Sequence, residues 1–298
     1  MAVSAHKCPV LALKNALPLH FFRIRFALFT FLITFAPKMK AMIFAAGLGT
    51  RLKPLTDTMP KALVPVGGKP LLQIQIERMK AAGITDIVIN VHHFASQIVR
   101  FIAEHDSFGM NIMFSPELDE LLDTGGGIRH AAPLIKPNTT AKDQYFLIHN
   151  VDILSNLDLS RLMALAAEPP VSEPTDKPRP LAYLLVSERR SLRYLLLNDE
   201  NRLVGWFNVS TGEVRSPYPK LKVAKCRKRA FAGIHLLSTA AFSLMESKPD
   251  KFSIIDFYLD ICSAVPVVGV TMPDLQLMDV GKYDVLGQAE TFVRTLDL

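Results

Sequence analysis

The stretch that decides the fold is residues 42–70, which read MIFAAGLGTRLKPLTDTMPKALVPVGGKP. It begins with a short β-type run, Met42–Ala46, and a glycine loop, Gly47–Gly49, follows this run directly. Glycines after a strand let backbone N–H groups approach phosphate oxygens, and Arg51 and Lys61 add the positive charge that a triphosphate needs. The stretch therefore predicts a strand that leads into a phosphate-binding loop.

Spacing excludes two common phosphate-binding loops. A P-loop requires the pattern G-x-x-x-x-G-K-[ST], which this stretch does not contain. A dinucleotide-binding loop requires a third glycine at the position of Leu52. Taken alone, Gly47 and Gly49 are equally compatible with an ordinary tight turn between a strand and a helix, beside solvated cations.

From Met39 onward, β-type runs alternate with helix-type stretches. The β-type runs are Met42–Ala46, Asp86–Val91, Asn111–Phe114 and Tyr145–His149. The helix-type stretches are Leu71–Ala82, Ala95–Glu104, Ile128–Ile135 and Leu157–Ala167. This alternation predicts an α/β domain with a wound, largely parallel sheet.

The pattern changes after a proline-rich segment at 168–180, which we expect to be a loop. The next β-type segments have no helix between them: Leu181–Ser187, Arg193–Asn198 and Leu203–Asn208, the last two joined as a hairpin. They predict a small β-rich insert at about 181–229, before the sheet resumes at Ala230–Leu237. Helices near Ala240–Glu246, Ile254–Ala264 and Val285–Thr295 complete a single domain at 39–298.

Residues 1–38 carry five basic side chains and no acidic one, and they contain the long uninterrupted apolar run Phe26–Ala36. A run of about 11 residues is too short for a bilayer span, which needs roughly 20. Three interpretations stay open: residues added by an upstream start codon, a membrane-surface anchor, and a secretory signal without an A-x-A cleavage site. If the first holds, Met39 is the true start, and a protein that begins there should fold and keep full activity.

The remaining residues carry 29 basic and 28 acidic side chains, so the net charge of +6 lies almost entirely in the first 38 residues. A nucleic-acid groove needs a concentrated basic face, so we expect no nucleic-acid partner, and a membrane partner only if residues 1–38 are native. Hydrophobic residues make up 49% of the chain, which excludes disorder. Cys8, Cys226 and Cys262 are too widely spaced for a zinc site or a disulfide framework, which indicates a reducing compartment, the cytoplasm.

The whole string, GxGTR followed by PLT, PK, VPV and KP, resembles the nucleotidyltransferase family that joins a nucleoside triphosphate to a sugar 1-phosphate. The resemblance extends over about residues 39–298 and implies a Rossmann-like wound mixed sheet of the nucleotide-diphospho-sugar transferase type. It also implies that Arg51 holds the β- and γ-phosphates and that Lys61 stabilises the α-phosphate during attack. Further nucleotide contacts are implied for Ala45, Ala46, Gly47, Gly49 and Thr50.

A second glycine cluster, LDTGGGIR at 122–129, precedes an expected helix. Three consecutive glycines allow a flat ligand to approach bare backbone, although a flexible loop is the alternative. In the family a similar loop lies beside the base and ribose, and this stretch resembles the uridylyltransferase-like branch that acts on amino-sugar phosphates. We therefore expect Gly125 and Gly126 to bind the nucleotide, and the nearby Glu117, Asp119 and Glu120 to form a solvated face.

The segment Tyr145–Asp152 is an apolar strand that ends in a carboxylate, at the strand end where α/β sheets place ligands. By resemblance, Asp152 is a Mg²⁺ ligand, although the family form N-G-D is N-V-D here. The second ligand is then Asp279 in LMDVG, which matches the family's W-x-D-x-G except for the tryptophan. Two carboxylates fit Mg²⁺, which prefers oxygen ligands. Judged without the resemblance, Asp279 is better explained as a helix N-cap before Tyr283.

Three further features are open to a functional interpretation. His92 and His93 are adjacent on a strand and point to opposite faces, so they cannot chelate one ion together, although His92 could line a nucleotide cleft. The F-x-G strand that contains Gly233 resembles the family's sugar pocket, which makes Gly233 a candidate sugar contact. The basic run 227–229 either meets the sugar phosphate or is a solvated cluster.

The expected function is Mg²⁺-dependent transfer of a nucleotidyl group from an NTP to a sugar 1-phosphate, which gives an NDP-sugar and pyrophosphate. We favour UTP with an N-acetylmuramate-like 1-phosphate. The alternative within the family is a guanylyltransferase that uses GTP and acts on mannose or heptose 1-phosphate. Two alternatives come from other classes: a catalytically silent nucleotide-sugar-binding regulatory protein, and a membrane-attached assembly factor that rests on residues 1–38 alone.

Overall fold

The computed structural model describes residues 39–136, 144–167 and 178–296. The predictions for residues 1–38, and most of the predicted proline-rich loop, lie outside these ranges. Within them, no helix is both long enough and apolar enough to cross a membrane.

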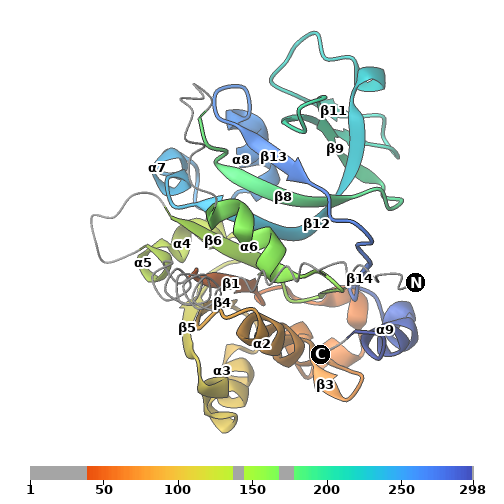
Figure 1. The fold of residues 1–298 in the computed structure, drawn as a ribbon. Coiled ribbons are helices and arrows are strands. Elements are labelled where there is room, and N and C mark those ends of the chain that lie inside the picture. Colours follow the sequence, from red (N-terminus) through yellow and green to blue (C-terminus); the bar gives the residue numbers. More distant parts are fainter. Residues whose placement is uncertain (1–38, 137–143, 168–177, 297–298) are drawn as a thin grey trace, which may run out of the picture. The chain divides into compact units, whose positions relative to one another are not determined.

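Four parallel strands form one end of the sheet (Figure 1). They are β1 (Ala41–Phe44), β4 (Asp86–Val91), β5 (Asn111–Pro116) and β6 (Tyr145–Asn150). β1 lies between β4 and β6, so that Met42 pairs with both Val88 and Ile148, and β4 pairs with β5 at the edge. The predicted wound parallel core is confirmed.

Antiparallel strands extend the sheet beyond β6. They are β12 (Arg227–Ser238), β8 (Ala182–Ser187), β9 (Arg193–Leu197), β10 (Leu203–Asn208) and β11 (Val214–Arg215), with β13 (Val267–Val270) parallel to β8. The predicted hairpin is formed by β9 and β10. In the spatial order β11-β10-β9-β12-β6-β1-β4-β5, the β-rich insert continues the main sheet.

Strand β8 lies within the predicted insert and pairs with β12 and β13 in the main sheet. Strand β12 is 12 residues long, and its register to β8 shifts between Phe231 and His235, around Gly233. The first part of β12 pairs with β9, whereas its second part pairs with β6 on one side and β8 on the other. A long bent strand can therefore serve both parts of the sheet.

The sheet separates two hydrophobic cores, because successive strand residues point to opposite faces. In β1, Ala41 and Ile43 face one core and Met42 faces the other. The first core also contains residues of α2 (Leu71–Ala81), α3 (Ala95–Glu104), α6 (Leu159–Ala167) and α9 (Leu286–Val293). The second contains residues of α4 (Asp123–His130), α5 (Ala132–Ile135), α7 (Ala241–Met245) and α8 (Ile254–Ile261).

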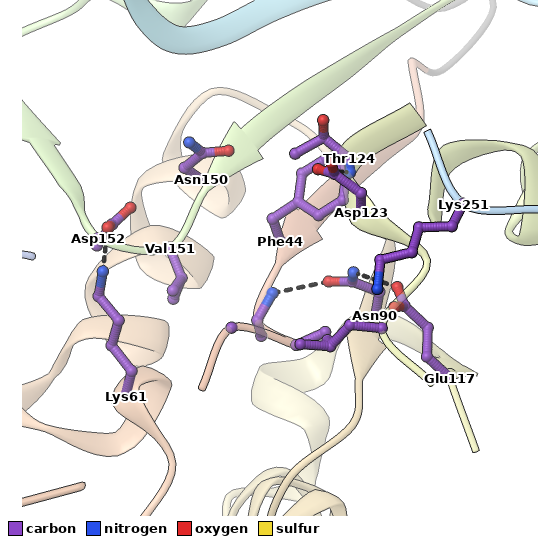
Figure 2. Close-up of a pocket in the computed structure, with 14 residues that line it drawn as sticks. Phe44, Lys61, Asn90, Glu117, Asp123, Thr124, Asn150, Val151, Asp152 and Lys251 are labelled. Atoms are coloured by element: carbon purple, nitrogen blue, oxygen red, sulfur yellow. Dashed lines mark hydrogen bonds and ion pairs between the residues drawn. The ribbon is translucent and has the colours of Figure 1, made fainter. Parts of the chain in front are cut away.

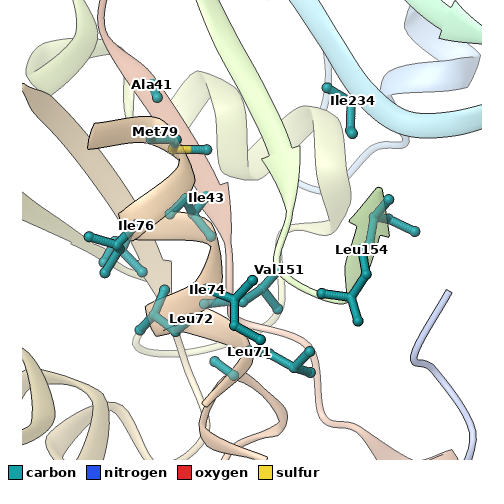
Figure 3. Packing of buried hydrophobic residues seen from close by; sticks show 14 of the residues in the cluster. Ala41, Ile43, Leu71, Leu72, Ile74, Ile76, Met79, Val151, Leu154 and Ile234 are labelled. Carbon is teal, nitrogen blue, oxygen red and sulfur yellow. The ribbon is translucent and has the colours of Figure 1, made fainter. Parts of the chain in front are cut away.

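Helix α2 follows residues 42–70, the signature stretch, and packs its apolar side against β1 (Figure 3). Ile74, Ile76 and Met79 are fully buried or nearly so, which anchors the segment that precedes the helix. Two short ribbons complete this side: β2 (Pro65–Val66) with β3 (Lys69–Pro70), and β7 (Ile153–Ser155) with β14 (Leu277–Asp279). The second ribbon brings a late segment of the chain to the end of β6.

Candidate functional site

A cavity of about 400 Å³ lies at the carboxyl ends of the parallel strands (Figure 2). The loops after β1 and β6, the end of β4 and the segment between β5 and α4 provide its walls, which is the position where wound sheets place ligands. Its lining consists of Phe44, Ala45, Ala46, Gly47, Lys61, Asn90, Glu117, Leu121, Asp123, Thr124, Asn150, Val151, Asp152 and Lys251.

An ion pair between the Lys61 Nζ and the Asp152 Oδ2 forms one wall of the cavity. The side chains are only 11% and 16% exposed. The main chain fixes Asp152, because Val280 N donates to Asp152 O at 2.9 Å and Val151 N donates to Phe44 O at 3.2 Å. The pair thus joins the signature stretch to the loop after β6.

Residues 45–51, the signature loop, pack against later residues of the signature stretch. Gly49 has φ of 65°, and a Cβ there would lie 2.8 Å from Thr56 Cγ2 and 3.0 Å from Lys61 Cβ. The Thr56 hydroxyl also donates to Gly49 O at 2.8 Å. The left-handed conformation and this close approach explain why glycine is required at position 49.

A second hollow, of about 320 Å³, adjoins the cavity. Gly47, Lys61 and Leu121 line both spaces. The other residues that line the hollow are Leu48, Gly49, Thr50, Arg51 and Gly281. The predicted nucleotide-binding loop and both predicted cations therefore lie around these two adjoining spaces. Lys61 lines both, and Arg51 lines the hollow.

The opposite wall of the cavity contains a buried chain of hydrogen bonds (Figure 2). Ala45 N donates to Asn90 Oδ1 at 2.7 Å, and Asn90 Nδ2 donates to Glu117 Oε1 at 2.8 Å. Glu117 Oε2 then accepts from Leu122 N at 2.9 Å. Asn90 and Glu117 are 2% and 4% exposed, so the prediction that Glu117 belongs to a solvated face is wrong.

A family model described as nucleotidyl transferase matches residues 40–175. This part of the chain is therefore similar to the nucleotidyl transferase family. The match contains the signature loop, Lys61, Asn90, Glu117 and Asp152, so the resemblance inferred from the motif string is confirmed.

Curated relatives are similar to part of the chain. An N-acetylmuramate alpha-1-phosphate uridylyltransferase from Neisseria meningitidis is 43% identical over 132 residues, which are 44% of this chain and 54% of the relative. A mannose-1-phosphate guanyltransferase from Gibberella zeae is 39% identical over 127 residues, which are 42% of this chain and 34% of the relative. The chain thus spans about half, or less, of the length of these relatives.

Solved structures match nearly the whole described region. HddC from Yersinia pseudotuberculosis, in a complex with GMP-PN, has a TM-score of 0.63 and 20% identity, over 86% of this chain and 99% of that one. A protein from Bacillus anthracis named putative glucose-1-phosphate thymidylyltransferase has a TM-score of 0.66 and 19% identity, over 87% of this chain and 97% of that one. At this identity they establish the fold, and the expected nucleotide-diphospho-sugar transferase type is confirmed.

Within this family fold, the two predicted metal ligands come to neighbouring strand positions. Asp279 in β14 pairs with Ile153 in β7, directly after Asp152. Only Asp152 lines the cavity, whereas Asp279 is exposed. A Cβ at Gly281 would lie 2.5 Å from Asp279 Oδ1 and 2.7 Å from Arg51 Nη2, so both charged groups lie over this glycine.

The alternative interpretation of Asp279 as a helix cap is wrong. Asp279 ends a strand, and the residue that precedes the short helix Tyr283–Val285 is Lys282. Among the described residues there is no group of three His, Cys, Asp or Glu side chains that could hold a metal ion. A Mg²⁺ site at Asp152 and Asp279 therefore stays a prediction.

The glycine cluster does not form a ligand loop, because Gly125 and Gly126 lie inside helix α4. A Cβ at Gly125 would lie 2.3 Å from the Phe252 ring, and a Cβ at Gly126 would lie 2.2 Å from Asp250 O. Their amides donate to Phe252 O at 2.8 and 3.2 Å. Gly125 and Gly126 thus leave space for Phe252 and Asp250 of the same protein. The residues of this helix that line the cavity are Asp123 and Thr124.

Gly233 is buried in β12 behind the cavity wall and does not line the cavity. It has φ of 74°, and a Cβ there would lie 2.7 Å from Asn150 Nδ2. Its role in the structure is to leave space for Asn150, which lines the cavity.

The basic run 227–229 is engaged elsewhere. Arg227 donates to Asn198 O at 2.6 Å, Lys228 lies over the Phe207 ring, and Arg229 pairs with Glu188. This arrangement favours a structural role over a contact with the sugar phosphate.

Beneath the cavity, His149 in β6 is fully buried. Burial, with a smaller contribution from the positive charge of Arg78, lowers the pKa of His149 to about 3. The imidazole is therefore neutral at physiological pH and adds no charge to the phosphate region.

Sequence reasoning missed several residues that line the cavity, among them Asn90, Asn150, Thr124 and Lys251. Asn90 is the next-to-last residue of β4 and Asn150 is the last residue of β6, so a polar residue near the carboxyl end of a parallel strand was a usable signal. Lys251 gave no such signal, because it reaches the cavity from the segment between α7 and α8.

Proposed function

We propose that this protein transfers a nucleotidyl group from an NTP to a sugar 1-phosphate and releases pyrophosphate. The observation that carries the proposal is that the cavity and the hollow adjoin and share Gly47, Lys61 and Leu121 in their linings. The larger space, walled by Phe44, Asn90 and Leu121, receives the nucleoside, and the smaller space, with Thr50 and Arg51, receives the phosphates.

Charge neutralisation is the main task of the protein in this reaction, because phosphoryl and nucleotidyl transfer need no nucleophile from the enzyme. Backbone N–H groups of Ala46 to Gly49 meet the phosphates, and Arg51 holds the β- and γ-phosphates. Lys61 leaves Asp152 and stabilises the charge that develops on the α-phosphate. The sugar phosphate oxygen attacks the α-phosphorus in line, and pyrophosphate leaves.

Asp152 and Asp279 would hold Mg²⁺, which supplies Lewis-acid neutralisation of the phosphate oxygens when bound. The ion pair with Lys61 supports this role for Asp152, because it places a cation against a carboxylate at the cavity wall. Two carboxylates and substrate oxygens match the preference of Mg²⁺ for a partly protein-built oxygen shell.

For the substrates, we favour UTP and an N-acetylmuramate-like 1-phosphate. The 43% identity to an N-acetylmuramate alpha-1-phosphate uridylyltransferase supports this choice. A guanylyltransferase acting on mannose or heptose 1-phosphate is the second candidate, supported by the 39% identity to a mannose-1-phosphate guanyltransferase. A silent regulatory protein is less well supported, because Arg51, Lys61 and Asp152 are all retained around the cavity.

A pyrophosphate-release screen tests the proposal. Each of the four common NTPs is combined with a panel of sugar 1-phosphates and Mg²⁺, and the nucleotide sugar is identified by mass spectrometry. We expect release with UTP and N-acetylmuramate 1-phosphate, and none when the sugar phosphate is omitted. Nucleotide binding without release for any combination would favour the silent regulatory protein instead.

A further inference from the structure

The hydrogen-bond chain from Ala45 to Leu122 joins the segments that enclose the nucleoside end of the cavity. Ala45 follows β1, Asn90 lies in β4, Glu117 follows β5, and Leu122 precedes α4. The orientation of the Asn90 amide is fixed by its neighbours, because an N–H faces its oxygen and a carboxylate faces its nitrogen. Every group in the chain therefore has one defined role as donor or acceptor.

The Glu117 side chain is costly to bury, because no cationic side chain in the described residues lies within ion-pair distance of its carboxylate. Two hydrogen bonds offset this cost only in part. An apolar residue would stabilise the wall with less desolvation. The position of a carboxylate at the cavity lining thus points to a role toward the ligand.

Gly127 provides an independent observation. A Cβ at this position would lie 2.8 Å from Glu117 Oε1, 3.3 Å from the Phe44 ring and 3.4 Å from Asn90 Nδ2. The third glycine of the cluster leaves the space that the hydrogen-bond chain occupies. The glycine cluster and the chain are therefore parts of one packed unit.

We infer that Glu117 and Asn90 are positioning residues that hold the Ala45 amide and the 117–122 segment in the shape that accepts the nucleoside. This inference rests on the proposed function. The hydrogen-bond chain holds the Ala45 amide, where the signature loop begins. Loss of these hydrogen bonds should therefore weaken nucleotide binding and leave the chemical step nearly unchanged. The buried negative charge also favours N–H donors of a base at this end and phosphates at the Arg51 end.

An exchange of polarity tests the inference. In Glu117→Gln, one amide oxygen faces two donors, and in Asn90→Asp, two carboxylates face each other. In the double variant, the carboxylate introduced at position 90 would accept from Ala45 N and from the amide introduced at position 117. The oxygen of that amide would in turn accept from Leu122 N. The double variant thus keeps the three hydrogen bonds and the net charge of the wild-type protein.

We expect each single variant to raise the KM for the NTP by about tenfold or more, the effect of losing about 1.4 kcal/mol of binding. The kcat and the KM for the sugar 1-phosphate should stay close to the wild-type values, and the double variant should recover the wild-type KM for the NTP. Hydrogen exchange at the Ala45 amide should be faster in the single variants and slow again in the double variant. A double variant that is no better than the worse single variant would overturn the inference.

The hydrogen-exchange measurement at the Ala45 amide separates failure of this inference from failure of the proposed function. If the wild-type protein released no pyrophosphate, the proposed function would fail, and Ala45 exchange would still decide whether the chain positions the loop. Gly127→Ala is a second route if Asn90→Asp does not fold, and it should also raise the KM for the NTP. Its matched control is Gly287→Ala in α9, where an added Cβ meets nothing within 4 Å. An unchanged KM in both Gly127→Ala and Glu117→Gln would contradict the positioning role.

Discussion

The Lys61 ammonium and the Asp152 carboxylate form an ion pair at the cavity wall, although 91 positions separate them in the sequence. The cation that we assign to the α-phosphate and the carboxylate that we assign to the metal therefore neutralise each other before the ligands bind. An arriving phosphate can take over Lys61 while a divalent cation takes over Asp152. Either ligand alone must break the ion pair and leaves one of its two charges without a partner, and the other ligand then neutralises that charge. Nucleotide and metal should therefore bind together more tightly than either binds alone.

Removing either phosphate-side cation should impair turnover. We expect Lys61→Ala and Arg51→Ala each to lower kcat/KM by about 100-fold or more, as for the loss of an electrostatic stabiliser of about 3 kcal/mol. Lys61→Ala should also lower the Tm, because it leaves the Asp152 carboxylate buried without its partner. Steady-state kinetics and thermal unfolding measure the two effects. Lys53→Ala is the control, because Lys53 is an exposed lysine of the same loop paired with Asp57, and wild-type activity is expected for it.

The metal pair gives a second prediction. Asp152→Asn and Asp279→Asn should each abolish most of the Mg²⁺-dependent activity, and Mn²⁺ should restore part of it because its ligand preference is similar. Without ligand, Asp152→Asn should lower the Tm because it breaks the pair with Lys61, whereas Asp279→Asn should leave it unchanged because Asp279 is exposed. Full Mg²⁺-dependent activity of Asp279→Asn would mean that another residue provides the second ligand.

The parallel half of the fold could be predicted closely from the sequence. The bounds of β4 and α3 agree with the predicted Asp86–Val91 and Ala95–Glu104, because local apolar periodicity determines both elements. The glycine cluster could not be placed correctly, because its helix depends on Phe252 and Asp250, which pack where side chains would otherwise lie. Local propensity favours a loop at three glycines, and a tertiary contact overrides it.

The residues of the site also divide into those that the sequence identified and those that it did not. Arg51, Lys61 and the glycine loop are close together in the sequence, so their pattern identified them. Glu117 looked like one member of an exposed acidic group, and only the fold reveals that β4 brings Asn90 beneath it. Burial of a carboxylate depends on contacts between distant segments, which hydrophobic periodicity does not report.

Gly233 supplies a third prediction. Gly233→Ala adds a Cβ at φ of 74° and 2.7 Å from Asn150 Nδ2, so it should destabilise the fold by about 1–3 kcal/mol and reduce activity by displacing Asn150. Gly212→Ala is the matched control, because Gly212 has φ of 73° and an added Cβ meets nothing within 4 Å. Denaturant unfolding and kinetics of both variants separate the backbone strain, which they share, from the contact with Asn150. Equal loss of activity in the two variants would rule out a role of this contact.

The last prediction concerns stability at acidic pH. His235 in β12 is fully buried beside the Tyr258 ring, and neither of its ring nitrogens has a hydrogen-bond partner among the described residues. Burial lowers the pKa of His235 to about 3, whereas the unfolded chain titrates near 6.5, so the unfolded state binds a proton more readily than the folded state. The contribution of His235 is therefore fully present above pH 6.5 and is lost as the pH falls toward 3. Between pH 7 and pH 5 the free energy of unfolding should fall by about 2 kcal/mol on account of this residue. Urea unfolding at both pH values measures the fall, and His235→Phe, which cannot bind a proton, should reduce it by that amount. An identical pH dependence in the wild-type protein and in His235→Phe would show that His235 does not control acid sensitivity.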